Sequence, residues 1–185
     1  MSQTTLETLD RTKLIGGSDI SAIMGLNPWK SALQLWLEKT GKVPPPDLSN
    51  VERVEIGIEL EEFVSRKFER KTGLKLRRDN RTLRHPIYDY MAGHIDRMVL
   101  DGESIFEAKT TSAWMEKEWE AEEIPQAYIL QLMWYMGLAK RDRGFIAVLI
   151  GGQKFVWKEI RFDEELFQKM VESARVFWEN FVLLD

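Results

Sequence analysis

Two carboxylates and a lysine fall at positions that a β-hairpin would bring together. Asp101-Gly102 is a strong signal for a two-residue turn between two segments of alternating hydrophobicity. In that register Asp96 lies opposite Glu107, and Lys109 projects from the same face because side chains alternate along a strand. His94 belongs to this charged face as well. The opposite face is expected to carry Ile95, Val99, Phe106 and Ala108.

Carboxylates that face each other across a hairpin repel, by up to about 1 kcal/mol. A divalent cation held between Asp96 and Glu107 would offset this repulsion, and Mg²⁺ prefers oxygen ligands of this kind. Lys109 would then lie where an ammonium group can orient an attacking water or stabilise developing negative charge. The alternative is an exposed hairpin face on which Lys109 forms an ordinary salt bridge with Glu107 or Asp96.

A third carboxylate, Glu61, falls in a predicted helix of about twenty residues that ends before Gly73. It borders the apolar stripe of that helix and is therefore expected to point partly inward. Gly57, one turn earlier, costs a helix about 1 kcal/mol relative to Ala, which indicates that a bulky partner or DNA approaches there. The alternative is that Glu61 belongs to a solvated acidic run.

The elements that would carry these residues follow from caps, turns and hydrophobic periodicity. Helices are predicted over 18–24, from Ser31 to Gly41, from Ser49 to Gly73, from Pro125 to about Lys140, and from Asp163 onward, with Ser18, Ser31 and Ser49 as caps. Strands are predicted within 74–85, 91–100, 103–110, 144–150 and 154–161. This order predicts an α/β (α+β) fold with a mixed central β-sheet flanked by helices.

The composition excludes several kinds of site. The 185 residues predict a single domain over 1–185, with amino-terminal helices over 1–45 and a core over 49–185. The chain has no cysteine and only two histidines, so any metal must be held by oxygen.

No segment is long and apolar enough to cross a membrane, and the amino terminus has no apolar signal core. We therefore expect a cytoplasmic protein.

Five blocks of residues occur in a recognisable order. They are Ile15–Gly25, Gly57–Glu61, Asp96, Glu107–Lys109 and Tyr128–Gln131. Over about residues 11–180 this order resembles the YqaJ-type viral recombinases, relatives of the phage lambda exonuclease in the PD-(D/E)XK nuclease superfamily. The resemblance implies a restriction-endonuclease-like core and a Mg²⁺-dependent deoxyribonuclease. Such an enzyme digests one strand of linear double-stranded DNA from its 5′ end and leaves 3′ overhangs for recombination.

The resemblance also assigns roles to individual residues. The matching positions are Asp96, Glu107 and Glu61 for metal binding, Lys109 for the motif lysine, and Gln131 for a helix glutamine beside the active site. We expect two Mg²⁺ ions, with Mn²⁺ as a substitute, and the backbone carbonyl of Ala108 as a further ligand. The position before Asp96 is Ile95 where the superfamily name suggests proline. Met133 stands where related helices often have a second glutamine.

A 5′-phosphate pocket is implied by the first block. Lambda-like members bind this phosphate with a serine and an arginine seven residues before it, and Arg11 and Ser18 have this spacing. By themselves they would be a tail residue and a helix cap. Trp29 is expected to stack on or separate terminal bases, whereas Trp36 lies on an apolar stripe typical of a core. His94 replaces a phosphate-contacting serine and would make that contact depend on pH.

The net charge of −4 is unevenly distributed. Residues 66–85 contain nine basic and two acidic residues, a formal charge of +7, which leaves −11 for the rest. Such a run is often a solvated face, but near a nuclease site contact with phosphates is favoured. The candidates for DNA contact are Arg77, Arg78 and Arg81.

The resemblance implies partners and a setting. These are a homotrimeric ring that encloses linear double-stranded DNA, a single-strand annealing protein, and a phage or prophage origin in a bacterial host. Two other functions remain open. One is a structure-selective or site-specific endonuclease on the same core, and the other is a non-catalytic DNA-end-binding recombination protein.

Overall fold

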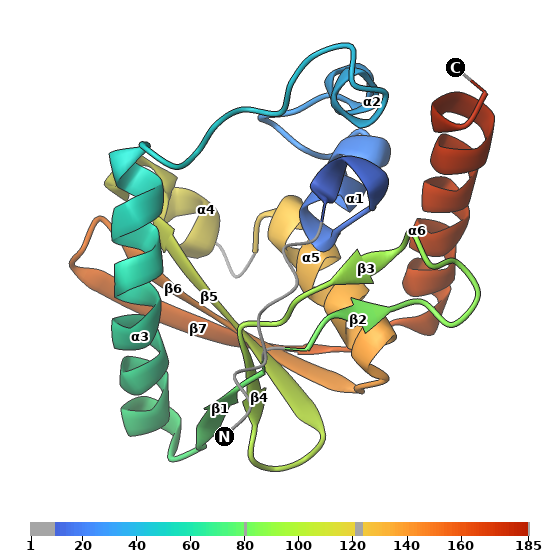
Figure 1. Cartoon of the computed structure of the whole chain (residues 1–185). Coiled ribbons are helices and arrows are strands. Elements are labelled where there is room, and N and C mark those ends of the chain that lie inside the picture. The colour runs from blue at the N-terminus through green and yellow to red at the C-terminus, as the bar shows by residue number, and fades with distance from the viewer. Residues whose placement is uncertain (1–9, 80, 121–123, 185) are drawn as a thin grey trace, which may run out of the picture.

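A five-stranded sheet forms the centre of the computed structural model, which describes residues 10–79, 81–120 and 124–184 (Figure 1). Its strand order is β1 (Leu76–Arg78), β4 (Arg97–Val99), β5 (Ser104–Thr111), β6 (Arg143–Ile150) and β7 (Lys154–Arg161). β5 and β6 run parallel, and the other neighbours run antiparallel. The predicted class, a mixed sheet flanked by helices, is confirmed.

Helices cover both faces of this sheet. α3 (Glu52–Thr72) packs on one face. Its Phe68 contacts Phe106 and Phe145 of the sheet and forms an aromatic cluster with them. α5 (Gln126–Ala139) lies on the other face, between the sheet and the pair α1 (Gly17–Ile23) and α6 (Glu164–Phe177) (Figure 1). Because β6 is covered on both sides, its residues are apolar in succession rather than alternating.

The β4–β5 hairpin has the predicted register. Arg97 pairs with Phe106, and Met98 pairs with Ile105. The turn needs the left-handed backbone of Gly102, whose φ is 80°. The predicted register is therefore confirmed for these pairs, while the pairing ends one residue short of Asp96 and Glu107.

One part of the hairpin prediction is wrong. Ile95 was expected on the face of Val99 and Phe106, but it packs into the core around α5 instead. Strand pairing begins only at Arg97. Regular alternation of side chains therefore begins at Arg97 and does not extend back to Ile95. Ile95 can then face the opposite side of the sheet.

The predicted helices are present, but two of their caps differ. Ser31 caps α2 (Ala32–Lys39) as expected, by accepting the N–H of the third helical residue. α1 begins after Gly16 rather than Ser18, and α3 begins after Val51 rather than Ser49. Ser18 lies inside the first turn of α1, where Asp19 Oδ2 accepts the N–H of Gly16 at 3.0 Å.

Short elements complete the described chain. They are η1 (Arg11–Lys13), β2 (Leu83–Arg84), β3 (Ala92–Gly93), η2 (Ala113–Met115), α4 (Glu116–Glu120) and η3 (Trp178–Val182). The sequence patterns missed η2 and α4. Within residues 10–79, 81–120 and 124–184, no helix has the length and apolarity needed to span a bilayer.

Candidate active site

Strand β5 carries the two residues of the Glu-x-Lys triplet on one face. Lys109 donates from Nζ to Glu107 Oε1 at 2.7 Å. Gln131 of α5 donates from Nε2 to the same carboxylate oxygen at 2.9 Å. Glu107 Oε2 is buried and has no hydrogen-bond partner. One oxygen of this carboxylate therefore accepts hydrogen bonds from an ammonium group and an amide group, and the other oxygen accepts none.

Asp96 lies just before β4 and bonds to β5 through its side chain. Its Oδ2 accepts the backbone N–H of Ala108 at 2.8 Å. The backbone N–H of Ala108 is thus bonded to a side-chain oxygen and not to a backbone carbonyl of β4, because the pairing of β4 with β5 does not reach this position. The N–H and C=O of one strand residue point to the same neighbour, so the Ala108 carbonyl lies on the side of Asp96.

Burial controls the charges of this group. Desolvation raises the pKa of Glu107 to about 8, and the nearby Asp96 adds to this rise while Lys109 opposes it. The pKa of Asp96 is also raised, chiefly by desolvation. Burial by itself would lower the pKa of Lys109, but Glu107 and Asp96 outweigh it and keep the ammonium protonated. Lys109 is therefore protonated and lies beside two carboxyl groups whose pKa values are raised.

Glu61 approaches this group from α3 but is bonded elsewhere. Arg97, buried between α3 and the sheet, donates to Glu61 Oε1 at 3.4 Å and to Glu62 Oε2 at 2.8 Å. Desolvation and the charge of Asp96 raise the pKa of Glu61. Among the described residues, no three acidic or histidine side chains stand close enough to form a metal site. The three-carboxylate metal shell therefore stays a prediction.

Arg97 and Gly57 both bear on the sequence argument about α3. Arg97 was missed, although its place directly after Asp96 in a strand predicts that it faces the opposite side. A Cβ at Gly57 would lie 3.4 Å from the hydroxyl of Thr110 on β5, which is an ordinary contact distance. The packing of α3 therefore does not by itself require this glycine, and the approach of a partner or DNA there stays a prediction.

A separate polar pocket contains the predicted phosphate-binding residues. It has a volume of about 580 Å³ and is lined by residues that include Arg11, Ser18, Trp29 and Lys39. Arg11 donates from Nη2 to Ser18 Oγ at 2.8 Å. The structure therefore brings together the arginine and the serine that the spacing of seven residues selected.

Lys39 is a residue of this pocket that the sequence patterns missed. Its buried ammonium donates to the carbonyl of Arg11 at 2.6 Å, to the carbonyl of Leu14, and to Asp19 Oδ2 at 2.9 Å. Desolvation lowers its pKa, although Asp19 opposes this. Lys39 thus fixes the segment that carries Arg11 against α1 and α2.

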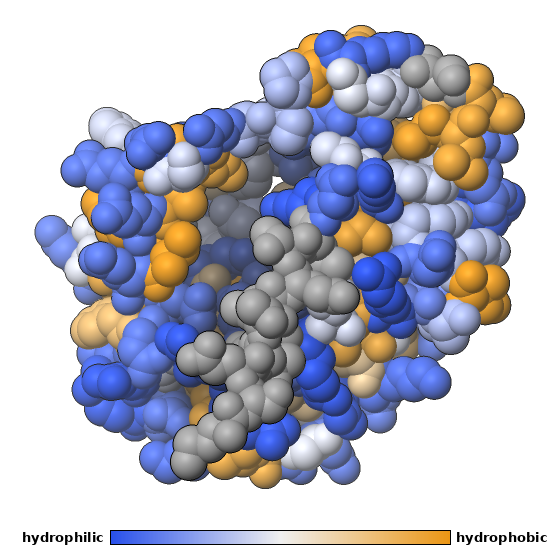
Figure 2. All heavy atoms as spheres, viewed as in Figure 1, coloured by the Kyte–Doolittle hydropathy of each residue, from blue (hydrophilic) through white to orange (hydrophobic). Residues whose placement is uncertain are grey.

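Tyr128 of α5 lies between the pocket and the carboxylates. The ring of Trp29 is 6.0 Å from that of Tyr128, and Lys109 Nζ is 5.5 Å from the centre of the Tyr128 ring. Trp29 is 58% exposed. Figure 2 shows that this face of the molecule is hollowed between α3 and the region of α1 and α2. Tyr128 therefore contacts both a residue of the pocket and the lysine of the Glu-x-Lys group.

Comparison with known proteins identifies the family. Residues 8–142 match the YqaJ-like viral recombinase domain. The chain belongs to this family. A relative, the uncharacterized protein YqaJ of Bacillus subtilis (strain 168), is 46% identical over 177 residues, which are 95% of this chain and 55% of that protein. The chain thus spans about half the length of this curated relative.

Solved structures of low identity share the fold of this YqaJ-like domain. An alkaline exonuclease from Laribacter hongkongensis superposes with a TM-score of 0.77 at 15% identity, over 94% of this chain and 90% of that chain. A phage related exonuclease from Haemophilus somnus 129PT has a TM-score of 0.73 at 16% identity, over 92% and 94%. The predicted family and the nuclease-type fold are both confirmed.

The remaining predicted DNA-contact residues of the YqaJ-like domain lie outside this group. Arg77 and Arg78 are exposed on the edge strand β1, where Arg78 is 3.3 Å from Glu62. Arg81 is tied to the carboxylate of Asp79 through both its Nε and Nη2. His94 is exposed, and its Nε2 lies 3.0 Å from Thr82 Oγ1. The DNA-contact roles of these residues stay predictions.

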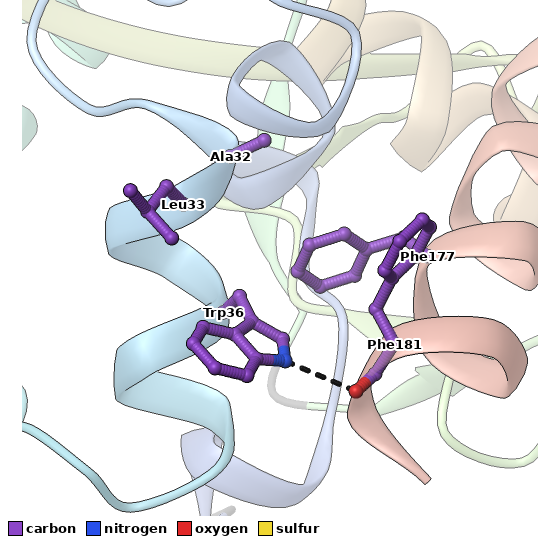
Figure 3. Close-up of a pocket in the computed structure, with 5 residues that line it drawn as sticks. All are labelled: Ala32, Leu33, Trp36, Phe177 and Phe181. Carbon is purple, nitrogen blue, oxygen red and sulfur yellow. Dashed lines mark hydrogen bonds between the residues drawn. The ribbon is translucent and has the colours of Figure 1, made fainter. Parts of the chain in front are cut away.

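An apolar hollow away from the charged residues is lined by Ala32, Leu33, Trp36, Phe177 and Phe181 (Figure 3). Trp36 packs against the core as predicted and donates from Nε1 to the carbonyl of Phe181 at 3.0 Å. The hollow has a volume of about 370 Å³. Because none of its lining side chains can ionise, it is not a candidate for phosphate chemistry.

Proposed function

We propose that this YqaJ-like domain is a Mg²⁺-dependent deoxyribonuclease that digests linear double-stranded DNA from 5′ ends and leaves 3′ overhangs for recombination. The observation that carries the proposal is the buried Glu107, with the half-buried Asp96 across the hairpin and Lys109 beside it. Membership of a viral recombinase family supports it, as does a fold shared with two exonucleases. The neighbouring pocket of Arg11 and Ser18 supports the preference for ends.

The residues present fit a divalent cation. Glu107 Oε2 is buried without a partner, and desolvation raises the pKa of both Glu107 and Asp96. A dication would satisfy that oxygen and offset the repulsion between the carboxylates. Asp96, Glu107 and the Ala108 carbonyl would hold Mg²⁺ or Mn²⁺, with Glu61 as the further carboxylate. When bound, the metal would neutralise the scissile phosphate and lower the pKa of an attacking water.

Lys109 and Gln131 would assist the reaction beside the carboxylates. Lys109 remains protonated at neutral pH because two carboxylates face it. Its ammonium would orient the attacking water and stabilise negative charge on the phosphate during the in-line displacement. Gln131 would keep Glu107 in one orientation by donating to Oε1.

The polar pocket would select the end of the duplex. A guanidinium and a hydroxyl are a common combination for a terminal phosphate, and Arg11 and Ser18 are already bonded to each other. Trp29 would stack on the terminal base, since an exposed indole can stack on any base. Arg77 and Arg78 would contact the duplex backbone from the edge of the sheet.

A ring-shaped homotrimer and a single-strand annealing partner belong to the same proposal. They rest on the resemblance to lambda-type exonucleases. Light scattering of the purified chain, alone and with linear duplex, would measure the number of subunits.

Linear and covalently closed circular duplexes, each with Mg²⁺ or with EDTA, provide the test. The proposal predicts digestion of the linear duplex only with Mg²⁺ and an intact circle under both conditions. Cleavage of the circle would indicate an endonuclease on the same core. Binding of ends without any hydrolysis would indicate a non-catalytic end-binding protein, and full activity of Lys109→Ala would contradict the site assignment.

A further inference from the structure

Tyr135 lies four residues after Gln131, on the same face of α5. Its hydroxyl oxygen is 3.2 Å from Gln131 Nε2. The same nitrogen donates to Glu107 Oε1 at 2.9 Å. Tyr135 is only 8% exposed, and its side chain interacts electrostatically with Glu107, Lys109 and Asp96. The hydroxyl is therefore part of the polar group around the Glu-x-Lys triplet.

Two glycines fix the ring of Tyr135. A Cβ at Gly17, in the first turn of α1, would lie 2.8 Å from the ring, and a Cβ at Gly93, in β3, would lie 2.6 Å from it. Side chains do not pack at such distances, so both positions require glycine. Gly17 precedes Ser18 of the phosphate pocket, and Gly93 precedes the segment that leads to Asp96. The ring thus packs between the pocket and the carboxylate pair.

The hydroxyl shares the Gln131 amide nitrogen with Glu107. The amide nitrogen has two hydrogens, of which one points to Glu107 and the other to the Tyr135 oxygen. If the hydroxyl were removed, the second N–H would be buried without a partner. The amide would then lose the bond that holds it in place beside the carboxylate.

We infer that Tyr135 is a positioning residue that holds Gln131 against Glu107 Oε1 and so keeps Glu107 Oε2 oriented for a metal ion. The inference rests on the proposed metal-dependent function. Groups that orient metal ligands through hydrogen bonds typically change metal affinity by about 10- to 100-fold. Because Tyr135 acts through Gln131, its effect on affinity must vanish when Gln131 is absent.

A double-mutant cycle with Mn²⁺ as the probe tests this directly. Mn²⁺ binding to the intact chain is measured by calorimetry for the wild type, Tyr135→Phe, Gln131→Ala and the double variant. We expect about tenfold weaker binding in each single variant and no further loss in the double variant relative to Gln131→Ala. Tyr90→Phe is the matched control, since its hydroxyl faces Glu179 of the carboxyl-terminal helical segment at 3.5 Å, and it should bind as the wild type does.

Four results would overturn the inference. Unchanged Mn²⁺ affinity in Tyr135→Phe, with an unchanged near-ultraviolet circular dichroism spectrum, shows that the hydroxyl does not position the ligand. Fully additive losses in the double variant, or an equal loss in Tyr90→Phe, show that Tyr135 does not act through Gln131. No binding by the wild type would remove the proposed metal site, and the inference with it.

Discussion

The carboxylate group and the phosphate pocket are held in different ways. Glu107 is 3% exposed, receives two donors on one oxygen and none on the other, and has a pKa raised to about 8 by desolvation. Arg11 is exposed, and its guanidinium is bonded to Ser18. Glu107 therefore has one oxygen without a hydrogen-bond donor, whereas the pocket exposes the guanidinium of Arg11 to solvent.

This difference indicates how the two regions divide the work. Groups that would perform chemistry are shielded from water. The local dielectric is low there, so a bound cation or a lysine interacts strongly with the carboxylates. Groups that would recognise a DNA end remain accessible and are placed by internal bonds such as those of Lys39. Substitutions in the first region should therefore change the rate of hydrolysis, and substitutions in the second should change the choice of substrate.

The largest effect is expected from Lys109→Met. Loss of an ammonium that stabilises transition-state charge should lower the rate of hydrolysis by about 10²- to 10³-fold. Binding of duplex ends should change little, since Lys109 is not in the phosphate pocket. Lys169→Met on α6, which removes an exposed lysine paired with Glu165, is the control and should retain the wild-type rate. An equal loss in both variants would contradict the assignment.

A second prediction concerns pH and the stability of the metal-free protein. The pKa of Glu107 is raised on folding, so its contribution to stability is fully present below its unfolded value, near 4.5, and is lost as pH rises toward about 8. The melting temperature without metal should therefore fall between pH 5 and pH 8. Glu107→Gln should show a smaller fall, because the amide does not ionise. A wild-type melting temperature that rises over this range would contradict the buried-carboxylate account.

Arg11→Ala should alter substrate choice rather than the maximal rate. We expect the preference for 5′-phosphorylated over 5′-hydroxyl ends to fall by about tenfold, which corresponds to one charge-assisted contact of about 1.4 kcal/mol. Arg11→Lys should restore part of the preference, because lysine keeps the charge but not the paired donors. Lys13→Ala, an exposed neighbour in the same turn, is the control. Equal loss on both kinds of end would show that Arg11 does not read the phosphate.

The smallest effect is expected at the sheet edge. Arg77→Ala should reduce the salt dependence of duplex binding by about one unit in the slope of log K against log salt. Arg81→Ala should reduce it less, because Asp79 already pairs with Arg81. Fluorescence anisotropy at several salt concentrations measures both slopes. A larger change for Arg81 would reverse the proposed order of DNA contacts.

Local signals predicted much of the fold and the centre of the site. The Asp101-Gly102 turn fixes the register of the hairpin, and that register brings Asp96 next to β5. Helix and strand positions followed from periodicity, because burial on one face leaves a regular pattern in the sequence. Arg11 and Ser18, which are in contact, were selected by the family resemblance and not by a local signal.

Contacts between distant segments could not be predicted in this way. Arg97 bonds to Glu62 across 35 positions, and Lys39 bonds to the Arg11 carbonyl across 28. No local pattern specifies such pairs, since each depends on how whole elements pack. The same reason explains Tyr135, whose contacts with Gly17 and Gly93 exist only after α5 has packed against α1 and β3.

The strand polarity of digestion tests the central claim most directly. A linear duplex carries a different fluorophore near the 3′ end of each strand and a 5′ phosphate on only one strand, and products are followed on denaturing gels with Mg²⁺. The account predicts that the phosphorylated strand shortens progressively from its 5′ end while the opposite strand remains full length for longer. Shortening from 3′ ends, or equal loss of both strands, would contradict it.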